Sequence, residues 1–431
     1  MYLFISIFYR LILWAVSPIL FIFILIHSLF SPIQFIPYLY KTGILIPKVL
    51  KTKPVIWIHG VSAGEVASIQ GIATLLRDQY HLFITSSTIS GWIIVQKLYP
   101  SDTLSFFPLD YPIIYKRLLK RIEPKAILFI EGEIWPNILK ESIRQGIPCF
   151  LLSGRLSDKE FKGYFKLKAF FGEVFNCFKV LSMQSEEDCR KACDLGVEPS
   201  KVFMGGNLKF DLKIDSSISQ RHISLWQKDS FILIAASTHR GEEAIILKTY
   251  ENLQHSFPNL KLVIAPRHPE RSDSIANIAN KLGLNPMKWS KYRELDPPEP
   301  INDRKVLILD TMGELTCFYP IAHLVLLAGS FVKGIGGHNP VEPAYFAKPI
   351  ITGPYTHNFN PMIGEMLSKS AIIQLENTGE PIGKALVSTI EKMILDPHLS
   401  TSLGDKAKDF ISKHRGSSLR TFNEIKSYLS H

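Results

Sequence analysis

Several acidic side chains directly follow short apolar runs, a placement suited to acid–base chemistry. Glu65 follows the run Val55–His59 within G-V-S-A-G-E, while Glu131 and Glu133 lie in F-I-E-G-E-I-W-P-N. Ser62 and Glu65 have the S-x-x-E spacing of a helix capping box, which makes capping the simpler role for this carboxylate. A helix amino terminus also binds anions, because its N–H groups are free and its dipole is positive there. A helix cap and a ligand site can therefore coincide at Glu65.

Small residues surround Glu65 and leave room for a substrate. Gly60, Ala63 and Gly64 add little bulk, so a substrate backbone or sugar can approach the carboxylate closely enough for it to act as a general base. Lys209 lies in G-G-N-L-K-F-D, just before a polar stretch. If the first domain ends at that stretch, Lys209 faces the same site as Glu65. An ordinary surface lysine is the simpler interpretation of Lys209.

Three loops in the second half of the chain gather small residues, hydroxyl groups and cations after apolar runs. They are A-S-T-H-R-G-E-E at 236–243, A-P-R-H-P-E-R at 265–271 and A-G-S-F-V-K-G-I-G-G-H-N-P-V-E-P at 328–343. A nucleotide phosphate needs such a combination of backbone N–H donors and a bidentate arginine. The sequence contains no Walker A loop and no H-E-x-x-H or G-x-S-x-G motif, which disfavours ATPase and nucleophilic hydrolase chemistry.

The composition indicates a globular protein with more than one domain. The chain has 431 residues, of which 46% are hydrophobic and 20% charged, and these values exclude a disordered chain. Its five cysteines form no C-x-x-C pair, so we expect a reduced compartment and no metal site. The net charge of +10 favours an anionic partner, such as a membrane surface or a phosphorylated substrate. Nucleic acid is not expected as a partner, since it would require a denser basic stripe.

Alternating strand and helix patterns must position these residues. The first half contains five short apolar runs that predict strands, at Val55–His59, Leu82–Ser86, Ala126–Glu131, Pro148–Leu152 and Val180–Met183. The second half contains five more, at Ile232–Ala236, Leu262–Pro266, Val306–Asp310, Leu324–Ala328 and Pro349–Thr352. Short apolar strands that alternate with helices predict buried parallel sheets with ligands at the carboxyl ends of the strands. We therefore expect an α/β protein with two Rossmann-like, doubly wound domains facing a cleft.

The expected domain organisation has four parts. Residues 1–50 form a membrane anchor and its basic flank, residues 51–212 form the first domain, residues 213–230 form a polar linker, and residues 231–431 form the second domain.

A long apolar stretch near the start of the chain predicts a transmembrane helix. Leu11–Phe30 contains no acidic or firmly charged side chain, and about 20 helical residues span the roughly 30 Å of a bilayer core. Arg10 precedes this stretch, whereas Lys41 and Lys48 are among the lysines that follow it, so the positive-inside rule places the remaining chain on the cytoplasmic side of the membrane. A helix that lies in the membrane interface remains an alternative to a single crossing.

A second segment combines basic and aromatic residues. Residues 155–175 interleave four lysines with phenylalanines and a tyrosine. At helical spacing this pattern fits either a surface for an anionic membrane or an amphipathic helix that packs its aromatic rings on the core.

Taken together, the motifs resemble one family, the membrane-anchored 3-deoxy-D-manno-octulosonic acid (Kdo) transferases of lipopolysaccharide assembly. The resemblance rests on nine motifs in order, H-G-V-S-A-G-E (59–65), E-G-E-I-W-P-N (131–137), R-L-S with G-Y (155–157 and 163–164), Q-S-E-E-D (184–188), N-L-K-F-D (207–211), S-T-H-R-G-E-E (237–243), P-R-H-P-E-R (266–271), D-T-M-G-E-L (310–315) and G-G-H-N-P-V-E-P (336–343). The ordered set covers nearly the whole chain and is far more specific than any single motif.

The resemblance implies a GT-B fold and an inverting, metal-independent transfer of Kdo from CMP-Kdo to a lipid A precursor (lipid IVA), without a cofactor. It assigns Glu65 as the general base and Glu131 and Lys209 to transition-state stabilisation. The nucleotide-binding positions that it implies are Pro266, Arg267, Met312, Gly313, Glu314, Asn339, Pro340, Val341 and Glu342. By this resemblance the first domain binds the acceptor and the second binds the nucleotide sugar.

Two other functions stay open at this point. Another membrane-associated GT-B glycosyltransferase that uses a UDP-sugar would share the architecture, and a non-catalytic, membrane-anchored nucleotide-sugar-binding protein would need no base. Nothing in the motifs sets the number of Kdo residues transferred.

Overall fold

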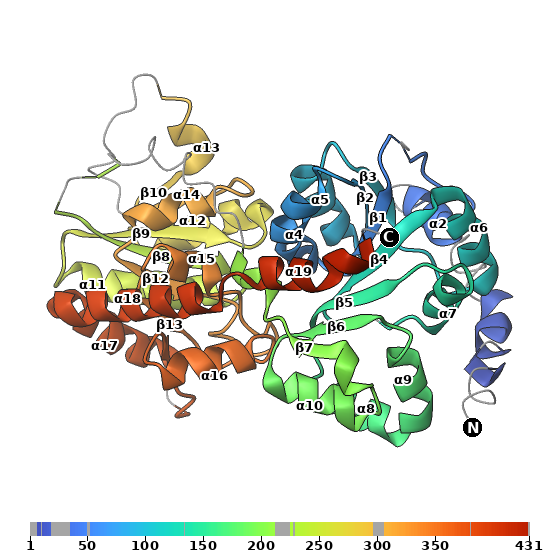
Figure 1. Cartoon of the computed structure of the whole chain (residues 1–431). Coiled ribbons are helices and arrows are strands. Elements are labelled where there is room, and N and C mark those ends of the chain that lie inside the picture. Colours follow the sequence, from blue (N-terminus) through green and yellow to red (C-terminus); the bar gives the residue numbers. More distant parts are fainter. Residues whose placement is uncertain are drawn as a thin grey trace. The chain divides into compact units, whose positions relative to one another are not determined.

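The computed structural model describes residues 7–9, 11–18, 35–49, 52–132, 134–211, 225–226, 229–295, 306–379 and 381–429. The chain divides into two compact units, the first formed by residues 1–213 and 414–431 and the second by residues 214–413 (Figure 1). Each unit contains one seven-stranded sheet, and every strand pair is parallel. The predicted α/β class with two parallel sheets is therefore confirmed.

The sheet of the first unit has the strand order β3-β2-β1-β4-β5-β6-β7. Its strands are β1 (Val55–His59), β2 (His81–Ser86), β3 (Thr103–Phe106), β4 (Pro124–Ile130), β5 (Cys149–Gly154), β6 (Val180–Met183) and β7 (Val202–Met204). Both faces of the sheet are buried, because alternate residues of one strand enter different cores: Trp57 packs in one cluster and Ile58 in another. This explains the continuous apolar runs of the central strands.

Helices cover both faces of this sheet. They are α2 (Phe35–Lys41), α3 (Ala63–Ser68), α4 (Gln70–Leu76), α5 (Ile89–Leu98), α6 (Pro112–Ile122), α7 (Pro136–Arg144), α8 (Asp158–Lys166), α9 (Lys168–Phe175), α10 (Glu186–Asp194) and, from the end of the chain, α19 (Ser417–Leu429). Residues of α6, α7 and α9 share a core with one face of the sheet, and residues of α3, α4 and α19 share a core with the other. The helices thus form the two outer layers of a doubly wound fold.

The sheet of the second unit has the order β10-β11-β9-β8-β12-β13-β14. Its strands are β8 (Phe231–Thr238), β9 (Leu260–Pro266), β10 (Pro286–Lys288), β11 (Val306–Ile308), β12 (Leu324–Leu327), β13 (Ile350–Thr352) and β14 (Ile373–Gln374). Its helices are α11 (Glu242–Gln254), α12 (Ser272–Lys281), α13 (Trp289–Tyr292), α14 (Leu315–Phe318), α15 (Val341–Tyr345), α16 (Asn360–Ser368), α17 (Ile382–Leu395) and α18 (Pro397–His414). Here too, two separate cores flank the sheet.

The last helix belongs to the first unit, which corrects the expected assignment of all residues 231–431 to one domain. The Tyr80 hydroxyl donates to the carbonyl of Leu429 (3.0 Å), and Ser182 and Thr421 share a hydrogen bond of 2.9 Å. The carboxylate of Asp211 accepts the N–H of Gly416 at 2.7 Å. Sequence periodicity identifies such a helix but carries no information about which sheet it covers. The predicted linker 213–230 lies largely outside the described residues.

The predicted anchor is described only in part. Residues 11–18 are helical, and the remainder of Leu11–Phe30 lies outside the described residues. In the part of the chain that the structure describes, we find no helix with the length and apolar character needed to cross a bilayer. The described helix is tied to the first unit, since the Tyr111 hydroxyl donates to the Leu13 carbonyl (2.9 Å) and the Tyr9 hydroxyl to Asp110 (2.9 Å).

The basic, aromatic segment forms two helices, α8 and α9, and packs much of its aromatic surface inward. Phe170 and Phe175 are buried in the core, and Phe161 and Tyr164 pack against it. The lysines of the segment are exposed, as is Phe165, which is 49% accessible. Packing on the core therefore accounts for most of the aromatic residues of this segment.

Candidate active site

Glu65 lies where β1 turns into α3, in the first turn of that helix. Ser62 is the N-cap of α3 and accepts the N–H of Glu65 (3.4 Å). The Glu65 carboxylate accepts the N–H of Val61 and the hydroxyl of Ser62, each at 2.8 Å. These bonds hold the carboxylate at the carboxyl edge of the sheet, and they leave it only partly exposed.

The surroundings of Glu65 favour its protonated form. Burial and, to a smaller extent, the negative charge of Glu131 raise its pKa to about 7, against the opposing effects of the Val61 and Ser62 hydrogen bonds and of Lys209. A carboxylate with a pKa near neutrality accepts a proton efficiently at physiological pH. The geometry therefore supports a proton-transfer role at Glu65.

Glu131 and Lys209 form an ion pair between the carboxylate and the ammonium group. Glu131 directly follows β4 with a φ of 64°, a left-handed conformation that is uncommon for a side chain other than glycine. Lys209 lies on the short 3-10 helix Leu208–Asp211. Because both residues influence the pKa of Glu65, the structure brings the three predicted catalytic residues together within the first unit. Glu133 lies outside the described residues.

A chain of side-chain hydrogen bonds positions the segment that carries Lys209. Asn207 accepts the N–H of Lys209 (2.9 Å) and donates to Gln184 (3.1 Å). Gln184 in turn donates to the carbonyl of Ser153 (3.0 Å), at the end of β5. The Q-S-E-E-D motif thus connects the ends of β5 and β6 to the segment that carries Lys209. Sequence reasoning identified this motif without assigning a role to Gln184, since the partner residues are distant in sequence.

His59, the first residue of the H-G-V-S-A-G-E motif, is a core residue. Its ring is buried, stacks on Phe107 with ring centroids 3.7 Å apart, and contacts Thr85. Burial lowers the pKa of His59 to about 3, so the ring is neutral at physiological pH. His59 therefore supports the strand end rather than the proton transfer.

In the second unit, Glu242 organises two of the three anion-binding loops predicted from the sequence. Its buried carboxylate accepts four main-chain N–H groups, those of His239 (2.9 Å), Gly329 (2.8 Å), Ser330 (3.0 Å) and Phe331 (2.9 Å). These bonds join the loop after β8 to the loop after β12. The S-T-H-R-G-E-E motif contains Glu242, but only the fold reveals that its partners lie in another loop.

The predicted nucleotide-binding residues Pro266 and Arg267 lie at the end of β9. Pro266 is the last residue of the strand, and the N–H of Arg267 donates to the carbonyl of Thr238 at 2.9 Å. The Arg267 side chain is half-buried and has no hydrogen-bond or ion-pair partner among the described residues. Its guanidinium group is therefore available to an anion.

The other predicted nucleotide-binding residues lie at the starts of two short helices. Glu314 lies at the N-cap position of α14, accepts hydrogen bonds from Trp289 (2.9 Å) and Thr311, and pairs with Arg293 at 2.8 Å. Met312 is 57% exposed beside Gly313. Asn339 accepts the N–H of Val341 (3.1 Å) at the start of α15, where Pro340 is the N-cap, and burial raises the pKa of Glu342. The Glu314 side chain forms no capping hydrogen bond to α14, and its carboxylate is bound instead by the side chains named above.

Two histidines that were not predicted as site residues lie beside Arg267. The Nε2 atoms of His239 and His338 are 2.9 Å apart, and the rings are nearly parallel, so one nitrogen donates to the other. The pKa of both rings is lowered, to about 4 for His338. Burial is the largest cause, and the charge of Arg267 contributes to the lowering in both rings. The loop motifs contain both histidines, but their pairing depends on the tertiary fold.

The arrangement of two parallel sheets, each covered by helices, has counterparts among solved structures. The UDP-GlcNAc 2-epimerase from Neisseria meningitidis bound to UDP-GlcNAc has a similar fold, with a TM-score of 0.58, 12% sequence identity and coverage of 88% of this chain and 100% of that one. At this identity the likeness concerns the fold alone, which is GT-B-like.

The family is established by sequence. Residues 40–212 match the family model described as 3-Deoxy-D-manno-octulosonic-acid transferase (kdotransferase). The chain is 31% identical to the 3-deoxy-D-manno-octulosonic acid transferase of Haemophilus influenzae over 87% of each chain. It is also 32% identical to the enzyme of that name from Rickettsia prowazekii, over 79% of this chain and 72% of the relative. The chain belongs to the Kdo transferase family and is a glycosyltransferase, which confirms the resemblance of its ordered motifs.

Proposed function

We propose that this protein transfers Kdo from CMP-Kdo to a lipid A precursor, lipid IVA, in lipopolysaccharide core assembly, with inversion at the anomeric carbon. The observation that carries the proposal is the half-buried Glu65, whose pKa is raised to about 7 beside the Glu131–Lys209 ion pair. Membership of the Kdo transferase family supports the sugar and the type of reaction.

Glu65 is the general base in this proposal. Its carboxylate removes the proton from a sugar hydroxyl of the acceptor as the hydroxyl oxygen attacks the anomeric carbon of Kdo. The bond from that carbon to the phosphate oxygen breaks, and CMP leaves with the electron pair. Lys209 and Glu131 stabilise the charge that develops in the transition state, because their ion pair is fixed before the substrate arrives.

The second unit holds the donor in this proposal. The guanidinium group of Arg267, which has no partner among the described residues, binds the phosphate. Asn339–Glu342 and Met312–Glu314 contact the cytidine nucleotide. No metal ion or cofactor takes part, since the chain's own cations meet the charge of the leaving group.

The acceptor is a membrane lipid, so the enzyme works at the cytoplasmic side of the inner membrane. We assign residues 11–30 as its single-pass anchor. The described residues 11–18 of this segment are mostly apolar, and the Leu13 carbonyl accepts the Tyr111 hydroxyl of the unit that carries Glu65.

Mass spectrometry of lipid IVA incubated with the purified protein and CMP-Kdo tests the proposal. We expect product masses that correspond to one or more added Kdo residues, and an unchanged lipid would contradict it. A thermal-shift assay compares CMP with UDP, since a bound nucleotide stabilises the protein. Stabilisation by UDP alone would indicate a transferase for a UDP-sugar, and stabilisation by CMP without turnover would indicate a binding protein.

A further inference from the structure

Arg155, which follows β5 in the first unit, has an unusual environment. Of the arginines that the structure describes, only Arg155 and Arg267 are half-buried with a side chain that forms no hydrogen bond or ion pair within the described chain. A guanidinium group removed from water without a partner is costly, and an anion from a ligand would compensate the cost. Arg267 is a predicted nucleotide-binding residue, whereas Arg155 has no assigned role.

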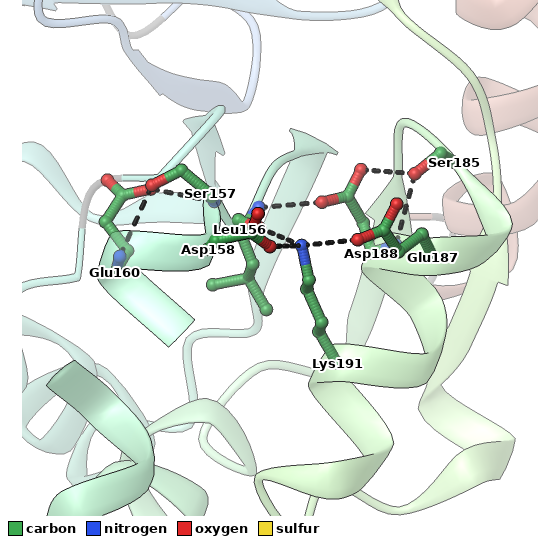
Figure 2. Close-up of polar contacts among 8 residues, drawn as sticks. All are labelled: Leu156, Ser157, Asp158, Glu160, Ser185, Glu187, Asp188 and Lys191. Atoms are coloured by element: carbon green, nitrogen blue, oxygen red, sulfur yellow. Dashed lines mark hydrogen bonds and ion pairs between the residues drawn. The ribbon is translucent and has the colours of Figure 1, made fainter. Parts of the chain in front are cut away.

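The main chain around Arg155 is fixed on both sides. The N–H of Arg155 donates to the carbonyl of Glu131 at 3.2 Å. The next residue, Leu156, donates its N–H to Asp188 (2.8 Å), and its carbonyl accepts the ammonium group of Lys191 (3.1 Å), as Figure 2 shows. The loop therefore holds Arg155 directly beside the backbone of the catalytic Glu131.

Four carboxylates on the nearby helices α8 and α10, those of Asp158, Glu160, Glu187 and Asp188, each have another partner. Lys191 pairs with Asp158 and Glu187, each at 2.8 Å. Asp188 accepts the hydroxyl of Ser185 (2.6 Å) in addition to the Leu156 N–H, and Glu160 closes a capping box with Ser157 (Figure 2). Among the described residues, these four carboxylates bind Lys191, a main-chain N–H group or a helix cap, and none of them pairs with the Arg155 guanidinium.

The backbone around Arg155 repeats the arrangement around Arg267. Glu131, with a φ of 64°, follows β4 and accepts the N–H of the arginine that follows the neighbouring strand β5. In the second unit, Ser237 has a φ of 58° at the end of β8, and Thr238 accepts the N–H of the arginine that follows the neighbouring strand β9. Each sheet thus holds one unpaired arginine at the carboxyl edge, where parallel sheets bind ligands.

We propose that Arg155 binds an oxyanion, a carboxylate or a phosphate, of the substrate that reaches Glu65 and Glu131. The assignment rests on the proposed function for the identity of the substrates. A guanidinium group recognises either oxyanion through two parallel hydrogen bonds, and lysine reproduces its charge but not its fork. The oxyanion belongs either to the acceptor lipid or to the donor sugar nucleotide.

The test compares Arg155→Gln, Arg155→Lys and the control Arg190→Gln, which removes an exposed arginine on α10. KM for CMP-Kdo and for lipid IVA is measured with the full-length protein, together with the direct binding of each substrate in the absence of the other. We expect Arg155→Gln to raise one KM and the matching dissociation constant at least about tenfold. The KM and the dissociation constant of Arg155→Lys should lie between those of Arg155→Gln and wild type. The values for Arg190→Gln should equal those of wild type.

The arms of the experiment identify the source of the oxyanion. Weaker acceptor binding, together with a lost preference for phosphorylated over dephosphorylated lipid, assigns a phosphate of the acceptor. Weaker donor binding alone assigns an oxyanion of CMP-Kdo. Binding of both substrates within about twofold of wild type in a folded Arg155→Gln protein would overturn the inference. Failure of the wild type to transfer Kdo would instead contradict the proposed function, and the binding measurements would still test Arg155.

Discussion

The two units place chemically active residues at the same edge of similar sheets, but they balance charge differently. In the first unit, Lys209 is neutralised by Glu131, and Glu65 has a raised pKa in half-buried surroundings. In the second unit, Arg267 has no partner within the described chain, and the nearby His239 and His338 bond to each other. In the function proposed above, this difference means that the first unit moves a proton and the second receives an anion.

Glu65→Gln gives the largest expected effect and tests the proton-transfer side of this comparison. The amide oxygen of glutamine can still accept the N–H of Val61 and its NH2 group can donate to the Ser62 hydroxyl, but glutamine cannot remove a proton, so we expect the transfer rate to fall about 10²- to 10⁴-fold. CMP binding should not change, because the nucleotide site lies in the other unit. The exposed Glu173→Gln on α9 is the matched control, and a near-wild-type rate for Glu65→Gln would contradict the role of Glu65.

Arg267→Gln tests the anion-binding side. Loss of its charged hydrogen bonds should raise KM for CMP-Kdo roughly 10- to 100-fold and leave KM for the lipid unchanged. Steady-state kinetics with each substrate varied separately make this distinction. Lys408→Gln, which removes an exposed cation from α18, serves as the control. An equal loss for both substrates would show that the two units do not divide the substrates in this way.

Glu242→Ala tests how the second unit maintains its site. Four N–H groups would lose their common acceptor, so we expect the free energy of unfolding to fall by about 3 kcal/mol, with weaker CMP binding. Chemical denaturation measures the loss, and the exposed Asp405→Ala should change it by no more than about 0.5 kcal/mol. An unchanged stability would argue against this carboxylate as the link between the two loops.

Chelation of divalent metals should have the smallest effect. Because the Arg267 guanidinium group meets the leaving phosphate in this account, we expect EDTA to leave the transfer rate unchanged. A rate that falls with EDTA and recovers on addition of Mg²⁺ would assign part of that role to a metal ion.

The strands show where sequence reasoning succeeds. Each of the ten predicted runs corresponds to a strand, because central strands of a covered parallel sheet are continuously apolar. The four strands without a prediction are β3, β7, β10 and β14, which are the edge strands of the two sheets. Edge strands are short and partly exposed, so they lack the apolar run that identifies the others.

The site was predictable as a set of residues but not as a set of interactions. The motif order identified Glu65, Glu131 and Lys209, and local spacing identified the Ser62 cap. The bonds that position them join distant segments, as Gln184 does with Ser153 and Asn207. The pairing of charged side chains also depends on contacts between distant segments. Arg155 lies close to Asp158 in sequence, but the carboxylate of Asp158 pairs with Lys191 in the fold.

The pH dependence of kcat/KM tests the central claim, a carboxylate base in the first unit with a pKa near neutrality. The free carboxylate is the active form, so kcat/KM should rise with pH, about tenfold per unit below a pKa of about 7, and level off above it. Glu131→Gln removes a charge that raises the pKa of Glu65, so this variant's rise should lie at lower pH. A flat or falling profile between pH 5.5 and 8 in the wild type, or an unmoved rise in Glu131→Gln, would contradict the account.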